Sequence, residues 1–141
     1  MTGADLDIED SALVEAAKRL ITERYKEGRH HIAAAVRTSS GRIHVGLHLD
    51  TYVGRASVCA EAVAVGRAMA EGDAEIERIV SVRHPRPREQ NQAIQVVSPC
   101  GICREMLNDF ARGADVILDL DGHLARVPVG RLLPNKYQRL P

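Results

Sequence analysis

Residues 58–62 read Val-Cys-Ala-Glu-Ala and residues 99–103 read Pro-Cys-Gly-Ile-Cys, and these two motifs are the most informative part of the sequence. They contain all three cysteines of the chain. Apolar residues at helical spacing over 58–71 and 101–112 place each motif at the start of a helix. The free N–H groups and positive dipole end of a helix start lower the pKa of a cysteine there. Two helix starts aimed at one point would therefore hold three thiolates beside a divalent cation.

The segments outside these motifs carry helix and strand patterns in turn. Apolar spacing predicts a first helix over residues 11–27, with Gly28 placed to end it. Two β-type runs at residues 30–37 and 42–49 surround a polar turn cluster and predict an antiparallel hairpin. Later strands are expected at residues 76–83, 115–120 and 123–128, and Asp121-Gly122 is expected to form the turn between the last two. This order predicts an α/β fold, a three-layer α/β/α sandwich with a mixed sheet, as a single domain over residues 1–141.

Composition and charge restrict the class of protein. The 141 residues include 19 basic and 19 acidic ones, so no net positive field attracts a polyanion and no nucleic-acid partner is expected. The N-terminal segment is acidic where a secretory signal is basic, and no stretch approaches the roughly 20 apolar residues of a membrane span. We therefore expect a cytoplasmic protein with no membrane partner. The odd number of cysteines also argues against a disulfide framework.

The cysteine spacing favours a catalytic metal centre over a closed structural one. Cys100 and Cys103, three residues apart, lie on the same side of one helical turn and can share an ion with Cys59. Three protein ligands leave open the fourth position that catalytic zinc sites keep for water. Glu61, two residues beyond Cys59, is better placed to move protons than to be a fourth ligand. The alternatives are a structural zinc site, buried thiols that act as small apolar residues, and a glutamate that only stabilises its helix start.

The two motifs resemble those of the cytidine deaminase family, whose signature joins a His or Cys, then x-Glu, to a later Pro-Cys-x-x-Cys. Residues 33–46, 103–110 and 131–137 are also similar to the family's first hairpin, second motif helix and C-terminal segment. The resemblance implies a Zn²⁺ ion held by Cys59, Cys100 and Cys103, with Glu61 as the catalytic acid and base. It also implies a five-stranded sheet flanked by helices, and a homotetramer, or a homodimer, whose subunits complete one another's active sites.

The chain departs from the family at the positions expected to contact substrate. Where the family carries Asn-x-Glu to grip the ribose, this chain has His48 and Asp50, which alternation along a strand would place on one face. Where the family has an aromatic residue to stack on the base, this chain has His30. Ala62 replaces the arginine that commonly follows Cys-Ala-Glu. Arg104 is then expected to offset the surplus negative charge of three thiolates.

These residues predict a zinc-dependent hydrolytic deaminase that releases ammonia from a small-molecule cytosine nucleoside, either cytidine, deoxycytidine or a modified cytosine nucleoside. One alternative is a blasticidin-S-type deaminase, which also lacks the arginine after Cys-Ala-Glu. Another is a non-catalytic zinc-binding module on the same fold. The loop at residues 84–95, with its arginines, is interpreted as a solvated surface or subunit contact, and a substrate lid is the alternative.

Overall fold

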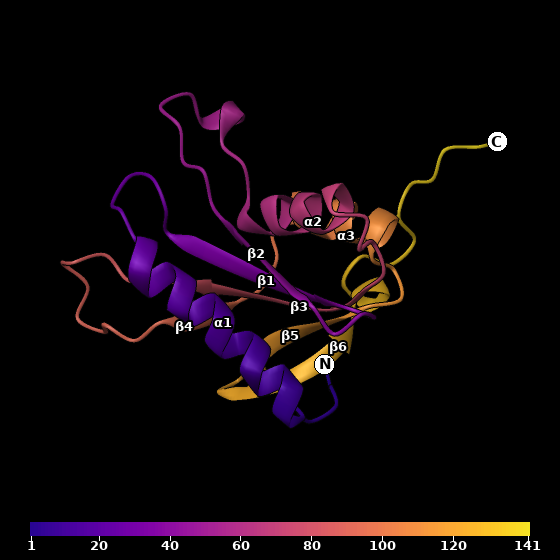
Figure 1. Ribbon diagram of the computed structural model, residues 1–141, viewed down its shortest axis with the longest axis horizontal. Coiled ribbons are helices and arrows are strands. Elements are labelled where there is room, and N and C mark those ends of the chain that lie inside the picture. The colour runs from indigo at the N-terminus through magenta and orange to yellow at the C-terminus, as the bar shows by residue number, and fades with distance from the viewer.

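The computed structural model describes residues 1–141 and has three layers around a central sheet (Figure 1). Helix α1 (Ile8–Arg24) covers one face of the sheet. Helices α2 (Ala60–Ala70) and α3 (Gly101–Phe110) lie together on the opposite face. This arrangement confirms the three-layer α/β/α sandwich expected from the sequence. None of the three helices combines the length and the apolar character needed to cross a bilayer.

The sheet is mixed, and its order places the two cysteine motifs on one side. The strands are β1 (Ile32–Thr38), β2 (Ile43–Leu47), β3 (Ile76–Arg83), β4 (Gln95–Val97), β5 (Asp115–Leu120) and β6 (His123–Pro128). Five of them run in the order β2-β1-β3-β5-β6, and the short β4 pairs with β3 as a sixth. Only the β3–β5 pair is parallel. Two 3₁₀ turns, η1 (Gly54–Ala56) and η2 (Val129–Leu132), complete the chain.

Alternation along the strands builds a separate apolar core on each face. In β1, Ala33 and Ala35 pack towards α1, whereas Ala34 and Val36 pack towards α2 and α3. Close packing of α2 on β2 depends on Gly46, because a Cβ there would lie 2.5 Å from the backbone nitrogen of Ala64. The missing side chain lets α2 lie directly on the sheet, with its first turn over the end of the hairpin.

The first helix differs from the prediction at both ends. It begins at Ile8 rather than residue 11, because Asp7 and Asp10 form a capping box with bonds of 2.8 and 3.1 Å. It ends at Arg24, so the assignment of Gly28 as its terminator was wrong. Gly28 instead takes a positive φ of 76° in the turn that follows.

The two hairpins agree with the sequence in their turns and differ in one strand end. Asp121 and Gly122 have φ values of 55° and 88°, as a two-residue hairpin turn requires. Strand β2 ends at Leu47 instead of residue 49. The cause is the start of β1 at Ile32, whose carbonyl oxygen accepts the last hydrogen bond from the His48 backbone N–H. Residues beyond this point have no β1 residue to pair with.

Candidate active site and metal centre

The three cysteine thiols meet at one point between the starts of α2 and α3. Cys59 is the N-cap of α2 and Cys100 is the N-cap of α3, while Cys103 lies in the first turn of α3. Their sulfur atoms all lie within 4.8 Å of one another, and the Cys59 and Cys100 Sγ atoms are 3.6 Å apart. Three soft donors that converge in this way fit a Zn²⁺ ion. The structure thus brings together the three residues that the motifs singled out.

The pKa shifts of the three thiols show that the cluster needs a cation to be ionised. Burial raises the pKa of the Cys103 thiol strongly, and the charge of Glu61 raises it further. Burial is also the main cause of the raised pKa of Cys59. Burial raises the pKa of Cys100 as well, but hydrogen bonds from the Cys103 backbone N–H and neighbouring thiols outweigh it, so that pKa is lowered. Two of the three thiols therefore resist ionisation unless a metal ion compensates their charge.

Glu61 lies beside the thiols and faces a cavity. It is the second residue of α2, and only 4% of it is exposed. Its carboxylate is near enough to raise the pKa of the Cys103 thiol, and Glu61 lines a cavity of about 130 Å³ together with Cys59 and Cys100. A buried carboxylate in this position can exchange protons with a molecule held in the cavity.

The three residues expected to contact substrate do not all reach this cavity. His48 lines it. His30 donates from Nδ1 to the His48 carbonyl oxygen at 2.8 Å, and Asp50 accepts from the Ser57 hydroxyl at 3.4 Å. Neither His30 nor Asp50 is part of the cavity wall. The expected strand alternation does not apply to His48 and Asp50, because β2 ends before them, and their contacts with substrate stay predictions.

Arg104 is bonded to the chain around the metal centre. Its guanidinium donates to the carbonyl oxygens of Pro99 and Leu132, at 3.0 and 3.2 Å, and to the Ser98 hydroxyl at 2.8 Å. These bonds connect the segment before Cys100 to η2. The compensation of thiolate charge by Arg104 stays a prediction.

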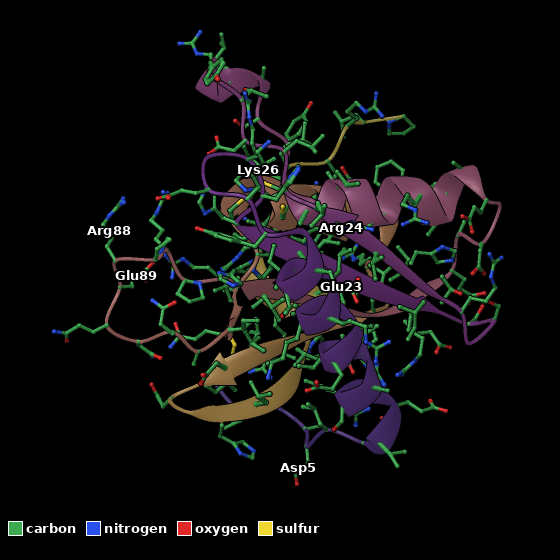
Figure 2. The ribbon with its side chains drawn as sticks, turned by 60° about the vertical axis from the view of Figure 1, so that its left-hand side comes forward. Asp5, Glu23, Arg24, Lys26, Arg88 and Glu89 are labelled. Atoms are coloured by element: carbon green, nitrogen blue, oxygen red, sulfur yellow. The ribbon has the colours of Figure 1, made fainter.

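The arginines of the loop after β3 are paired with acids. Figure 2 shows this loop, with Arg88 and Glu89, standing out from the body of the molecule. Arg83 makes a two-pronged contact with Glu89 at 3.0 and 2.7 Å. Arg86 and Arg88 approach Glu27 at 3.7 and 3.2 Å. Two glutamates therefore offset most, but not all, of the positive charge of these three arginines.

Comparison with known proteins places the chain in a family. The model of the cytidine and deoxycytidylate deaminase zinc-binding region matches residues 7–118. The chain belongs to this family. Its members are hydrolytic deaminases with a zinc-binding region, and the three convergent thiols of this chain are positioned to hold a metal ion.

Similarity to individual deaminases extends over nearly the whole chain. Blasticidin-S deaminase from Bacillus cereus is 43% identical over 131 residues, which cover 93% of this chain and 94% of the relative. A cytidine deaminase from Sporosarcina psychrophila is 23% identical over 137 residues, with coverage of 95% and 93%. The solved cytidine deaminase from Burkholderia pseudomallei has a TM-score of 0.71 and 26% identity, and covers 90% of this chain and 98% of its own. The solved cytidine deaminase from Bacillus anthracis, at 23% identity, shares the fold with a TM-score of 0.76. The match covers 93% of this chain and 90% of that one.

Three residues of the cavity wall that lie outside the cysteine motifs were not identified from the sequence. Ile32 and Val97 form apolar walls, and Ser98 adds a hydroxyl beside them. Ile32 and Val97 carry no signal that separates them from ordinary core residues. Ser98 directly precedes the Pro-Cys motif, and this adjacency to a metal ligand could have identified it.

Proposed function

We propose that this chain hydrolyses the exocyclic amine of a cytosine nucleoside with a modified sugar, of the kind that blasticidin S represents, and releases ammonia. The similarity to the Bacillus cereus enzyme carries this proposal. That relative is named as a blasticidin-S deaminase and is 43% identical over 93% of the chain, against 23% for the cytidine deaminase of Sporosarcina psychrophila.

The replaced ribose-binding pair supports the same substrate class. His48 and Asp50 stand where the family carries Asn and Glu, and the Asp50 carboxylate accepts a hydrogen bond from Ser57. A site built to bind a particular hydroxyl discriminates strongly against analogues that lack it. Loss of the usual pair therefore favours a substrate that does not depend on it.

Glu61 would carry the protons of the reaction. When bound, Zn²⁺ supplies the Lewis-acid chemistry that makes water nucleophilic near neutral pH. As water adds to C4 of the ring, the Glu61 carboxylate takes one proton from it and gives this proton to N3. The remaining hydroxyl proton then passes through Glu61 to the amine, the C4–N bond breaks, and ammonia leaves. One water is consumed, one ammonia is released, and Glu61 ends ionised as it began.

The cavity beside Glu61 argues for an enzyme rather than a structural zinc module. A structural zinc site is closed by four protein ligands. Here three thiols converge, and the nearest carboxylate lines an accessible cavity instead of completing the set. This combination supports Glu61 as the catalytic residue and the three cysteines as ligands.

The assembly and location belong to the same proposal. We expect one domain over residues 1–141 that forms homotetramers in the cytoplasm. Tyr52 and Val53 are exposed on the loop that rises beyond β2 (Figure 1), and Ile102 is exposed in the first turn of α3. Exposed apolar side chains of this kind support a contact with another copy. Three free thiols within 4.8 Å support a reducing compartment.

An ammonia-release assay on blasticidin S, cytidine, deoxycytidine and cytosine tests the substrate class. We expect the highest kcat/KM for blasticidin S, with release slowed at least roughly a hundredfold in Glu61→Gln, the matched control. Ordinary efficiency on cytidine with none on blasticidin S would contradict the proposal and indicate a salvage cytidine deaminase.

A double variant tests the role of the replaced pair. His48→Asn with Asp50→Glu restores the residues typical of the family. The restored hydrogen bonds to ribose should raise kcat/KM for cytidine and not for blasticidin S. The measurement is kcat/KM of the double variant for each of the two substrates. An equal change for both would exclude a sugar-specific role for His48 and Asp50.

A further inference from the structure

We infer that Ser98 is a substrate-binding residue of this deaminase, whose hydroxyl donates to an acceptor atom of the pyrimidine ring and is oriented by Arg104. The inference rests on the proposed function and adds a residue to its site. It starts from the wall of the cavity, where Ser98 lies with His48, Glu61 and the thiols of Cys59 and Cys100.

The hydrogen bond from Arg104 fixes the role of the Ser98 hydroxyl. A guanidinium can only donate, so in the 2.8 Å contact between Arg104 Nη2 and Ser98 Oγ the serine oxygen accepts. The hydroxyl proton has no partner within the chain and stays available as a donor. A bond accepted from a cation also polarises the hydroxyl and strengthens its own donation.

Arg104 is itself held in place from two sides. Its Nε donates to the Pro99 carbonyl oxygen at 3.0 Å and its Nη1 to the Leu132 carbonyl oxygen at 3.2 Å. With these bonds the guanidinium cannot follow a displaced Ser98 without losing contacts. Arg104 is therefore a positioning residue, and it acts on substrate through Ser98.

The size of the cavity indicates which part of a nucleoside Ser98 would meet. The cavity measures about 130 Å³, below the roughly 300–1,000 Å³ of pockets that enclose a whole drug-sized ligand. Ile32 and Val97 supply apolar walls against which a ring can pack. A space of this size suits the base, with the sugar outside it. Ser98 thus meets the base and not the sugar.

The test combines Ser98→Ala and Ser98→Thr with Ser39→Ala as a matched control. Ser39 is an exposed serine at the far end of the hairpin, bonded to Glu75 at 3.3 Å. Ser98→Ala should raise KM roughly tenfold through the lost hydrogen bond, with kcat nearly unchanged and about one zinc per chain. The rise should be equal for cytidine, deoxycytidine and blasticidin S. Ser98→Thr, which keeps the hydroxyl, should restore KM.

Arg104→Lys completes the experiment as a double-mutant cycle. Lysine keeps the charge and loses the planar fork. It should raise KM in the unaltered protein and have little further effect in Ser98→Ala, because both changes remove one interaction. An unchanged KM in Ser98→Ala, a penalty confined to one sugar, or additive effects of the two variants would overturn the inference. Absence of turnover in the unaltered protein on every cytosine substrate would instead overturn the proposed function, and the inference with it.

Discussion

The thiol cluster opens from the buried Cys103 to the exposed Cys100, whereas the charged cluster beneath α1 is centred on a fully buried carboxylate and contains charges of both signs. Asp10 is fully buried and accepts from Arg78 at 2.7 Å and from Arg37 at 3.4 Å. At the other cluster, three thiols and the Glu61 carboxylate meet without any basic partner in contact with a sulfur atom. A buried cluster that balances its own charge is costly to break at one partner, whereas a cluster of like groups is a site for an external cation.

The largest effect should follow from removing a metal donor. Cys103→Ala leaves two thiols, so zinc should fall from about one per chain to near zero, with loss of all activity. The matched control is Leu107→Ala, a buried residue one turn further along α3. It should cost about 2–5 kcal/mol of stability through a cavity and retain zinc. Metal analysis of both purified variants makes the distinction, and zinc retained in Cys103→Ala would remove that thiol from the ligand set.

The next effect concerns catalysis without metal loss. Glu61→Gln keeps the shape of the side chain but cannot accept a proton, so turnover should fall by at least roughly a hundredfold. Zinc content and the unfolding midpoint should stay close to those of the unaltered protein. Near-normal turnover in a variant that retains zinc would exclude Glu61 from proton transfer.

A substitution in the charged cluster beneath α1 should lower the stability of the protein and leave its activity unchanged. Asp10→Ala leaves the guanidinium groups of Arg37 and Arg78 without their buried partner, which should cost about 3–5 kcal/mol. Glu9→Ala is the control, because Glu9 is exposed and lies 3.9 Å from Arg37, a pair worth about 0–1 kcal/mol. Urea unfolding measures both. Equal losses in the free energy of unfolding of the two variants would show that the buried Asp10 stabilises the protein no more than the exposed Glu9.

A smaller loss of stability should appear at acid pH, when Asp73 near the turn of the β1–β2 hairpin is protonated. Hydrogen bonds from His44, Thr38 and Ser40 lower the pKa of Asp73 from 3.8 to about 2. Because the folded pKa is the lower one, the stabilisation is complete above pH 4 and is lost as the pH falls towards 2. Asp73→Asn should flatten this part of the stability curve. The pKa of Glu89 is also lowered to about 2, so stability should still depend on pH in this range after Asp73→Asn. Adding Glu89→Gln should remove that remaining dependence.

The sequence was sufficient where local rules act without competition. The cysteine motifs at helix starts predicted the convergence of Cys59, Cys100 and Cys103, since a helix start fixes where its first side chains lie. The Asp121-Gly122 turn followed in the same way from the need for positive φ. These features depend on a few adjacent residues, and the alternation of patterns around them was enough for the layer order.

The sequence was insufficient where distant segments decide the outcome. The end of β2 at Leu47 depends on where its partner β1 begins, and the position of Gly28 outside α1 depends on the turn that follows the helix. The same holds for the site. Ser98 and Arg104 form their pair only because β4 leads into α3 beside η2, an arrangement that no local spacing shows.

X-ray absorption at the zinc edge of the purified protein tests most directly whether the thiol cluster is an open catalytic site. We predict about one zinc per chain, with three sulfur ligands at roughly 2.3 Å and one oxygen or nitrogen ligand at roughly 2.0 Å. That light ligand should change when a substrate analogue is added, since Cys59 and Cys100 line the cavity in which the analogue would bind. Four protein ligands that do not respond to any analogue, or a protein that binds no zinc, would contradict this account.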